Sequence, residues 1–224
     1  MHRPKDDWLL WQLADSAFPT GGFAHSGGLE PAWRHGELRG GADLADFIRA
    51  SLVQLGRASL PFMTSVHASP ETFAAADRLC DVFTANHVAN RASRAQGRAL
   101  VAAARQAFGV LLPGSRPGGL EPDRPCFHLA PTFGAVTRAL DVDRASAARL
   151  FLFVHLRGAV ASAVRLGIAG PMEGQALQHR LGARCERLLT VCLKLTVEDA
   201  AQTAPLLEIW QGTQDRLYSR LFQS

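Results

Sequence analysis

Apolar residues recur at helical spacing along nearly the whole chain, in segments that Gly and Pro separate. Trp8, Leu9 and Leu13 share one face of a first helix that Asp6 or Asp7 could cap. The same periodicity predicts helices from 26–29 to 36, from 43 past 60, and over 73–86, 87–108, 131–140, 144–168, 171–195 and 205–210. Pro61 is expected to kink or divide the helix that runs from 43 past 60. We therefore predict an all-α bundle of about eight to ten helices.

The segment 144–168 is apolar almost all round, which predicts a central helix. Gly158, Ala159, Ser162 and Ala163 are expected to let neighbouring backbones approach it closely. Its apolar run nears the length of a membrane span, but it contains His155 and two arginines, and charges are costly in a bilayer. We expect a buried helix and no membrane association.

Length and composition favour one domain over residues 1–224, with a separate role for the C-terminal residues from about 212 to 224. The N-terminus lacks the order of a signal peptide, so we expect a cytoplasmic protein. The four cysteines are widely spread and form no CxxC pair, which argues against a disulfide framework or a zinc motif. Residues 111–125 contain four prolines and three glycines and predict a long loop.

Candidate cofactor sites are not evident in the sequence. No two of the eight histidines stand four residues apart, so we predict no metal ligand among them and interpret each as a surface or core residue. Neither lysine, Lys5 or Lys194, follows the glycine-rich stretch of a phosphate-binding loop. We expect no cofactor and no hydrolysis of GTP or ATP by this chain alone.

The net charge of +4 comes almost entirely from arginine. Arg91, Arg94, Arg98 and Arg105 fall within about 60° of one another on the 87–108 helix and form a basic stripe. The simpler interpretation is a solvated helix face, since charged residues usually face water, and docking onto an acidic protein surface is the functional alternative. Nucleic acid is less favoured because the rest of the chain lacks a matching basic and aromatic pattern.

A glycine-rich turn follows the first helix. It contains Gly21, Gly22, His25, Ser26, Gly27, Gly28 and Glu30. Residues 24–28 come close to the G-x-S-x-G motif of serine hydrolases, but that motif requires a strand before the turn, and here a helix precedes it. We therefore do not expect an enzyme. Two interpretations stay open: the glycines supply positive φ angles and close helix contacts, or the turn contacts a partner.

The C-terminal residues Tyr218, Ser219, Arg220, Leu221 and Phe222 combine aromatic, basic and apolar side chains. Such residues can form the centre of an interface, especially Tyr and Arg. A segment folded back on its own domain would use the same residue types, so both interpretations stay open.

Several segments resemble the urease accessory protein UreF family. They are LADSAFPTGGFAHSGGLE (13–30), NRASRAQGRAL (90–100), LRGAVASAVRLGIAGP (156–171), TAPLLEIW (203–210) and LYSRLF (217–222). The resemblance implies a non-enzymatic, homodimeric nickel-insertion chaperone that binds UreD (UreH) and recruits the GTPase UreG. The complex would act on apo-urease, so that nickel and a carbamylated lysine are installed when GTP is hydrolysed.

The resemblance also implies that the C-terminal segment orders against UreD. The matching positions are Pro205, Glu208, Tyr218, Ser219, Arg220, Leu221 and Phe222. Gln214 stands where the family often has His. Our hypothesis is that residues 21–30 and the arginine stripe face the GTPase, while the C-terminal segment faces UreD. A helical scaffold unrelated to nickel, holding an acidic protein or RNA, is the alternative.

Overall fold

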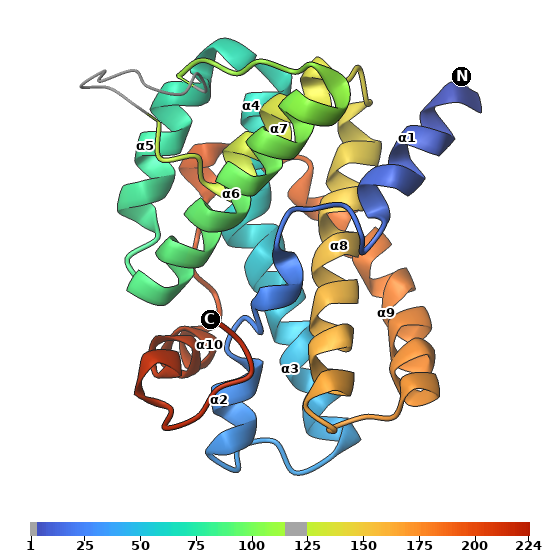
Figure 1. Cartoon of the computed structure of the whole chain (residues 1–224), viewed down its shortest axis with the longest axis vertical. Helices are drawn as coiled ribbons and strands as arrows, with labels where there is room; N and C mark the ends of the chain where they lie inside the picture. The colour runs from blue at the N-terminus through green and yellow to red at the C-terminus, as the bar shows by residue number, and fades with distance from the viewer. Residues whose placement is uncertain (1–3, 115–124) are drawn as a thin grey trace.

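The computed structural model describes residues 4–114 and 125–224, and the regular elements in these ranges are all helical (Figure 1). In chain order they are α1 (Pro4–Ala14), α2 (Leu29–Arg34), α3 (Gly41–Gln54), α4 (Leu60–Ala68), α5 (Phe73–Phe83), α6 (His87–Phe108), α7 (Leu129–Ala139), α8 (Arg144–Arg165), α9 (Pro171–Cys192) and α10 (Pro205–Gly212). These ten α-helices confirm the all-α prediction. Most of the predicted loop at 111–125 lies outside the described residues.

The helix predicted from residue 43 past residue 60 is divided near Pro61. A π-helical turn, Leu55–Ser59, joins α3 to α4, and Pro61 lies in the first turn of α4. Proline has no N–H to donate and its ring collides with the carbonyl four residues earlier, which accounts for the local change of helix type. The predicted division is confirmed.

In the described part of the chain, α4 and α7 make the most extensive contact between two helices. A Cβ atom built on Gly134 of α7 would lie closer than 3.0 Å to the carbonyl oxygen of Met63 on α4, a separation that real Cβ atoms essentially never show. Gly97 of α6 is restricted in the same way by the carbonyl of Phe127, just before α7. These two glycines let α7 lie against the backbone on both sides.

Helix α8 is central, as predicted, because it contacts α1, α2, α3, α4, α7 and α9. It is long and apolar enough to cross a membrane by length and composition, but half of its most apolar stretch is buried inside the fold. The expected close approach at Gly158 is wrong: a Cβ atom there would meet no atom within 4 Å. Gly158 lies on the wall of a cavity and does not contact a neighbouring helix.

Helix α1 begins at Pro4, so the expected capping residues Asp6 and Asp7 lie inside it. It projects from one end of the bundle (Figure 1). Leu13 near its end is buried in the core, whereas the side chains of Trp8 and Trp11 are 73% and 60% exposed. Leu9 and Leu10 are partly buried against the same core, so the predicted apolar face covers the bundle from Leu9 onward, while the two tryptophans point to solvent.

Candidate functional site

The two segments singled out at the ends of the chain lie against each other. The C-terminal segment, residues 212–224, runs along α2 and the glycine turn, residues 21–30 (Figure 1). The backbone N–H of Gln223 donates to the carbonyl of Ala24 at 2.8 Å, and Ser26 N–H donates to the carbonyl of Ser224. Of the two interpretations left open for this segment, the structure shows the one in which it folds back onto its own chain.

Glu30 holds the C-terminal segment in place. Its side chain has no exposed surface and lies in the first turn of α2. Oε1 accepts the backbone N–H of Leu221 at 2.6 Å, and Oε2 accepts that of Phe222 at 3.0 Å. The Nε2 group of Gln214 donates to the same Oε2 and to the carbonyl of Phe222, both at 3.0 Å. One buried carboxylate thus fixes two consecutive residues near the end of the chain, Leu221 and Phe222, together with the side chain of Gln214.

The glycines of the turn have structural roles of the kind predicted. Gly21, Gly27 and Gly28 have φ angles of 72°, 62° and 89°. A Cβ atom on Gly28 would lie 3.1 Å from the backbone nitrogen of Gln211, so α10 can pack directly on the start of α2. Gly22 has more space, since its nearest neighbour would be the side-chain oxygen of Gln96 at 3.6 Å.

Ser26 is placed to cap α2 and not to attack a substrate. It is 4% exposed, and its Oγ accepts the N–H of Glu30 at 3.3 Å. Its neighbour His25 directs Nδ1 to the Oγ of Ser224 at 2.7 Å, a contact between the turn and the last residue of the chain. Burial and the nearby charge of Arg91 lower the pKa of His25, so its ring is neutral near pH 7. The geometry does not support the serine hydrolase alternative.

The C-terminal segment divides into buried and exposed residues. Phe222 is 2% exposed, and the guanidinium of Arg165 lies 4.4 Å from the centre of its ring. Tyr218 is completely exposed, Leu221 is half exposed, and Ser219 is exposed between them. The buried residues fix the segment, and the exposed ones form a surface that we call the tail face, residues 218–221.

The arginine stripe is partly occupied by contacts within the chain. Arg91 makes a forked contact with Asp215 at 2.8–3.0 Å, and Arg220 reaches the same carboxylate at 2.8 Å. Arg91, followed by Arg220, lowers the pKa of Asp215. Arg94 lies 3.7 Å from Asp81. Asp215, which follows the buried Gln214, therefore joins α6 to the tail.

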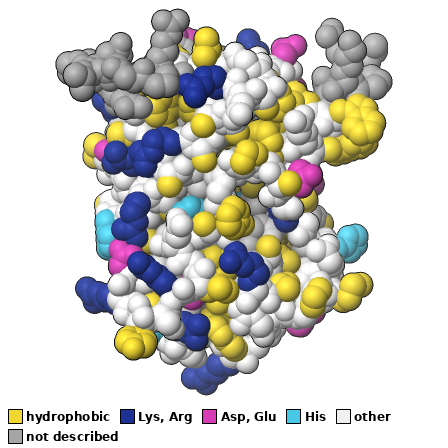
Figure 2. Space-filling view, in the orientation of Figure 1, with side chains coloured by type: hydrophobic (Ala, Val, Ile, Leu, Met, Phe, Trp, Pro, Cys, Tyr) yellow, Lys and Arg dark blue, Asp and Glu magenta, His cyan; other side chains and the backbone are white. Residues whose placement is uncertain are grey.

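Arg91, Arg98 and Arg105 are the exposed arginines of the stripe, and of these Arg91 is held by Asp215. In the view of Figure 2, Lys and Arg side chains gather on the side of the molecule where α6 and the C-terminal segment lie. Neither Asp215 nor Gln214 was predicted from the sequence as a contact residue. Gln214 stood out only as a departure from the family pattern, and Asp215 is 124 positions from Arg91.

Helix α10 supports the tail from the other side. It begins at Pro205, and the Oε1 of Glu208 accepts from the Nε2 of Gln54 at 3.1 Å. The carbonyl of Glu208 accepts from the Nδ2 of Asn86 at 2.7 Å, which joins α10 to the start of α6. Pro205 and Glu208 therefore position the helix from which the C-terminal segment leaves.

A cavity of about 350 Å³ is lined by the glycine turn, α3, α6 and α8, and Ser224 lies at its edge. His155 faces it and directs Nε2 to the Oγ of Ser51 at 3.1 Å. Burial lowers the pKa of His155 from 6.5 to about 4, so the ring is neutral at physiological pH. Side chains with metal-ligand atoms gather elsewhere, where Asp81, Cys126 and His128 lie within 4.8 Å of one another.

Comparison with known proteins assigns the chain to a family. A family model described as UreF matches residues 38–182, between the glycine turn and the C-terminal segment. Urease accessory protein F of Arabidopsis thaliana is 39% identical over 221 residues, covering 97% of this chain and 92% of the plant protein. Urease accessory protein F of Oryza sativa subsp. indica is 36% identical over 219 residues, with 96% and 84% covered. Urease accessory protein UreF of Mycobacterium tuberculosis (strain H37Rv) is 31% identical over 216 residues, with 96% and 98% covered.

The matched residues include α3 to α8 and the first half of α9, and the relatives extend the likeness over nearly the whole chain. All three relatives carry the name of a urease accessory protein. The chain therefore belongs to the UreF family of urease accessory proteins.

Proposed function

We propose that the chain is a non-enzymatic adaptor in urease maturation, which binds UreD (UreH) and recruits the GTPase UreG. Apo-urease in the same complex then receives nickel when GTP is hydrolysed. The chain acts in the cytoplasm as one helical unit over residues 1–224 and forms a homodimer. Family membership supports this function, and four free thiols fit a reducing compartment.

The observation that carries the proposal is the ordered tail face. Tyr218 and Leu221 are exposed on the C-terminal segment. Glu30 accepts a hydrogen bond from the backbone of this segment, and the contact between Arg91 and Asp215 attaches the segment to α6. A segment that is ordered before binding loses less conformational entropy when a partner docks. An exposed Tyr beside an Arg has the composition of a binding hot spot. We assign the tail face to UreD.

Arg98 and Arg105, the exposed arginines of the stripe that do not hold Asp215, are assigned to UreG. Both side chains extend from a long, regular helix, and forked guanidinium groups suit an acidic protein surface. Arg91 is a poor test of this assignment because it also holds Asp215 and the tail. The proposal assigns no arginine to the GTPase active site.

Reversing the charge at Arg98 and Arg105 together is expected to reduce recovery of UreG by at least about tenfold, without lowering the melting temperature. Charge pairs at the rim of an interface act mainly through steering and complementarity, so the loss should grow as salt concentration falls. The recovery of UreG is measured by pull-down with the complex of this chain and UreD. Arg180→Glu/Arg184→Glu on α9 is the matched control, with the same change of charge on another exposed helix.

If the Arg98→Glu/Arg105→Glu variant recovers UreG at the level of the α9 control, the stripe is not the GTPase surface. The tail assignment to UreD would be untouched by that result.

The function itself is tested by co-expression with UreD, UreG and apo-urease. The readout is the nickel content of purified urease with the full chain and with a version that ends at Arg216. We expect nickel-loaded urease with the full chain and nickel-poor urease with the shortened one. Equal nickel content with the full chain, the shortened chain and no chain at all would contradict the adaptor function.

A further inference from the structure

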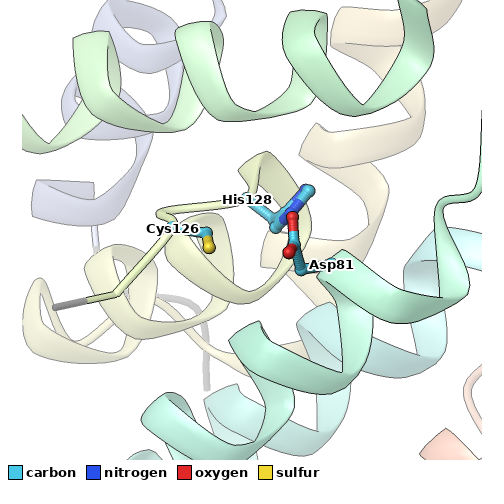
Figure 3. Close-up of side chains that lie close together, drawn as sticks. All are labelled: Asp81, Cys126 and His128. Atoms are coloured by element: carbon cyan, nitrogen blue, oxygen red, sulfur yellow. The ribbon is translucent and has the colours of Figure 1, made fainter. Parts of the chain in front are cut away.

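Three side chains with metal-ligand atoms come together at the junction of α5, α6 and α7. Asp81 extends from α5, Cys126 lies in the segment before α7, and His128 immediately precedes the first residue of α7 (Figure 3). The Nε2 atom of His128 lies 2.9 Å from Oδ1 of Asp81. All three ligand atoms lie within 4.8 Å of one another, and this is the one such group found in residues 4–114 and 125–224.

The histidine ring is held in the orientation that a ligand needs. His128 is completely buried, and its Nδ1 lies 3.1 Å from the Oγ of Ser93 on α6. The same Oγ accepts the backbone N–H of Leu129 at 3.1 Å, which fixes the serine as well. Metal-bound histidines typically donate their second ring N–H to a neighbouring oxygen, and Ser93 provides that oxygen.

The backbone of the ligand segment is also fixed. The carboxylate of Asp77, fully buried on α5, accepts the N–H groups of Phe127 at 3.0 Å and His128 at 2.7 Å. Phe127 itself has a φ of 59°, a conformation that non-glycine residues seldom adopt. This turn places Cys126 and His128 on the same side of the segment, toward Asp81.

One thiolate, one imidazole and one carboxylate form a donor set typical of zinc sites. We propose that Asp81, Cys126 and His128 bind one divalent transition-metal cation, for which Zn²⁺ is the best match. Asp81 is about one-third exposed and Cys126 is only partly buried, so the cation can enter from solvent. The open fourth position of a tetrahedral ion would take a water molecule.

Without metal, the carboxylate of Asp81 is already paired. His128 and Asn90 donate to it, and Arg94 lies 3.7 Å away. On binding, the Cys126 thiol releases its proton to solvent, and the His128 proton moves from Nε2 to Nδ1, where Ser93 accepts it. Arg94 is partly exposed and can turn toward water as the cation arrives. The proposal does not depend on the function in urease maturation.

The test uses the full chain, reduced and freed of metal, titrated with Zn²⁺ against a chromophoric chelator and separately with Co²⁺. We expect one equivalent of Zn²⁺ and, for Co²⁺, the near-ultraviolet absorption of a thiolate ligand. Cys126→Ala should abolish that absorption. Asp81→Asn changes a metal ligand, so it should weaken Zn²⁺ binding by more than the roughly 10- to 100-fold that is typical when a hydrogen-bond partner of a ligand is removed. Ser93→Ala should weaken it by about tenfold.

Cys185→Ala is the matched control, since it removes a buried thiol on α9. It should bind Zn²⁺ and Co²⁺ as the parent chain does. Circular dichroism shows whether each variant keeps its helices, and bound Zn²⁺ should raise the melting temperature of the parent chain but not of Cys126→Ala.

Equal Zn²⁺ affinity in the parent chain and Cys126→Ala would overturn the proposal and leave Asp81 and His128 as a structural hydrogen bond. Tighter binding of Ni²⁺ than of Zn²⁺ would overturn the assignment to zinc. Metal binding is measured here without a partner protein. The metal proposal can therefore be wrong while the adaptor function is right, and the adaptor function can be wrong while the metal proposal is right.

Discussion

Replacing Glu30 by Gln will release the C-terminal segment from α2 and weaken the complex with UreD. The carboxylate accepts from two backbone N–H groups and from Gln214, whereas an amide has a single acceptor oxygen and would turn its own N–H₂ toward donors. Each buried donor left without an acceptor costs about 1–3 kcal/mol. The segment avoids this cost by leaving its site, because water then accepts hydrogen bonds from its N–H groups. If only a tenth of the molecules keep the segment in place, the apparent affinity for UreD falls about tenfold.

Limited trypsin digestion and a binding titration with UreD measure the two effects. Cleavage after Arg216 and Arg220 should accelerate in Glu30→Gln, because undocking exposes the backbone around them. Glu37→Gln is the control: Glu37 is exposed just after α2, and its substitution removes the same charge. Wild-type cleavage and affinity in Glu30→Gln would show that the carboxylate does not hold the segment.

Replacing Gly134 by Ala will destabilise the fold by about 3 kcal/mol or more, at the upper end of the range for overpacking. The new methyl group would collide with the carbonyl of Met63 and lie 3.2 Å from the backbone nitrogen of His67, both on buried α4. Backbone cannot move aside as a side chain can, so α7 must shift away from α4. That shift also disturbs the neighbouring Phe133, whose ring packs on Phe151 at 5.1 Å.

Urea-induced unfolding followed by circular dichroism gives the free energy of unfolding. Gly158→Ala is the matched control, because it makes the same change inside α8 where a Cβ atom meets nothing within 4 Å. Helix propensity predicts that this control gains roughly 0.5–1 kcal/mol. A Gly134→Ala midpoint equal to that of the parent would contradict the close α4–α7 contact.

The helices could largely be predicted from the sequence, because their signals are local. Helix α6 spans His87–Phe108 as predicted, between the capping Asn86 and the left-handed Gly109. Helix α8 begins at Arg144 as predicted, after Asp143, whose side chain caps it. Periodicity and caps decide such boundaries within a few neighbouring residues. Gly158 shows the limit of this approach, since a small residue in a helix does not reveal whether it faces a neighbour or a cavity.

The contacts between distant residues could not be predicted in this way. Glu30 accepts from backbone N–H groups about 190 positions away. Nearly every residue type has a backbone N–H, so the sequence does not reveal which of them donates to Glu30. Arg91 was seen as part of a stripe, but its carboxylate partner Asp215 becomes apparent only when α6 and the tail are brought together. Asp81 lies 47 positions before His128, so the spacing rules for metal motifs do not detect the pair.

Binding of UreD to the ordered tail face is best measured by titrating UreD with the Tyr218→Ala variant. Tyr218 is completely exposed, so its removal should leave the melting temperature unchanged. Loss of an interface hot spot costs about 2 kcal/mol or more, and we therefore predict an affinity at least roughly 30-fold weaker than that of the parent chain. Met172→Ala, an exposed apolar residue on α9, should bind UreD as the parent does. Equal affinity for UreD in the parent, Tyr218→Ala and Met172→Ala would show that the tail face does not bind UreD.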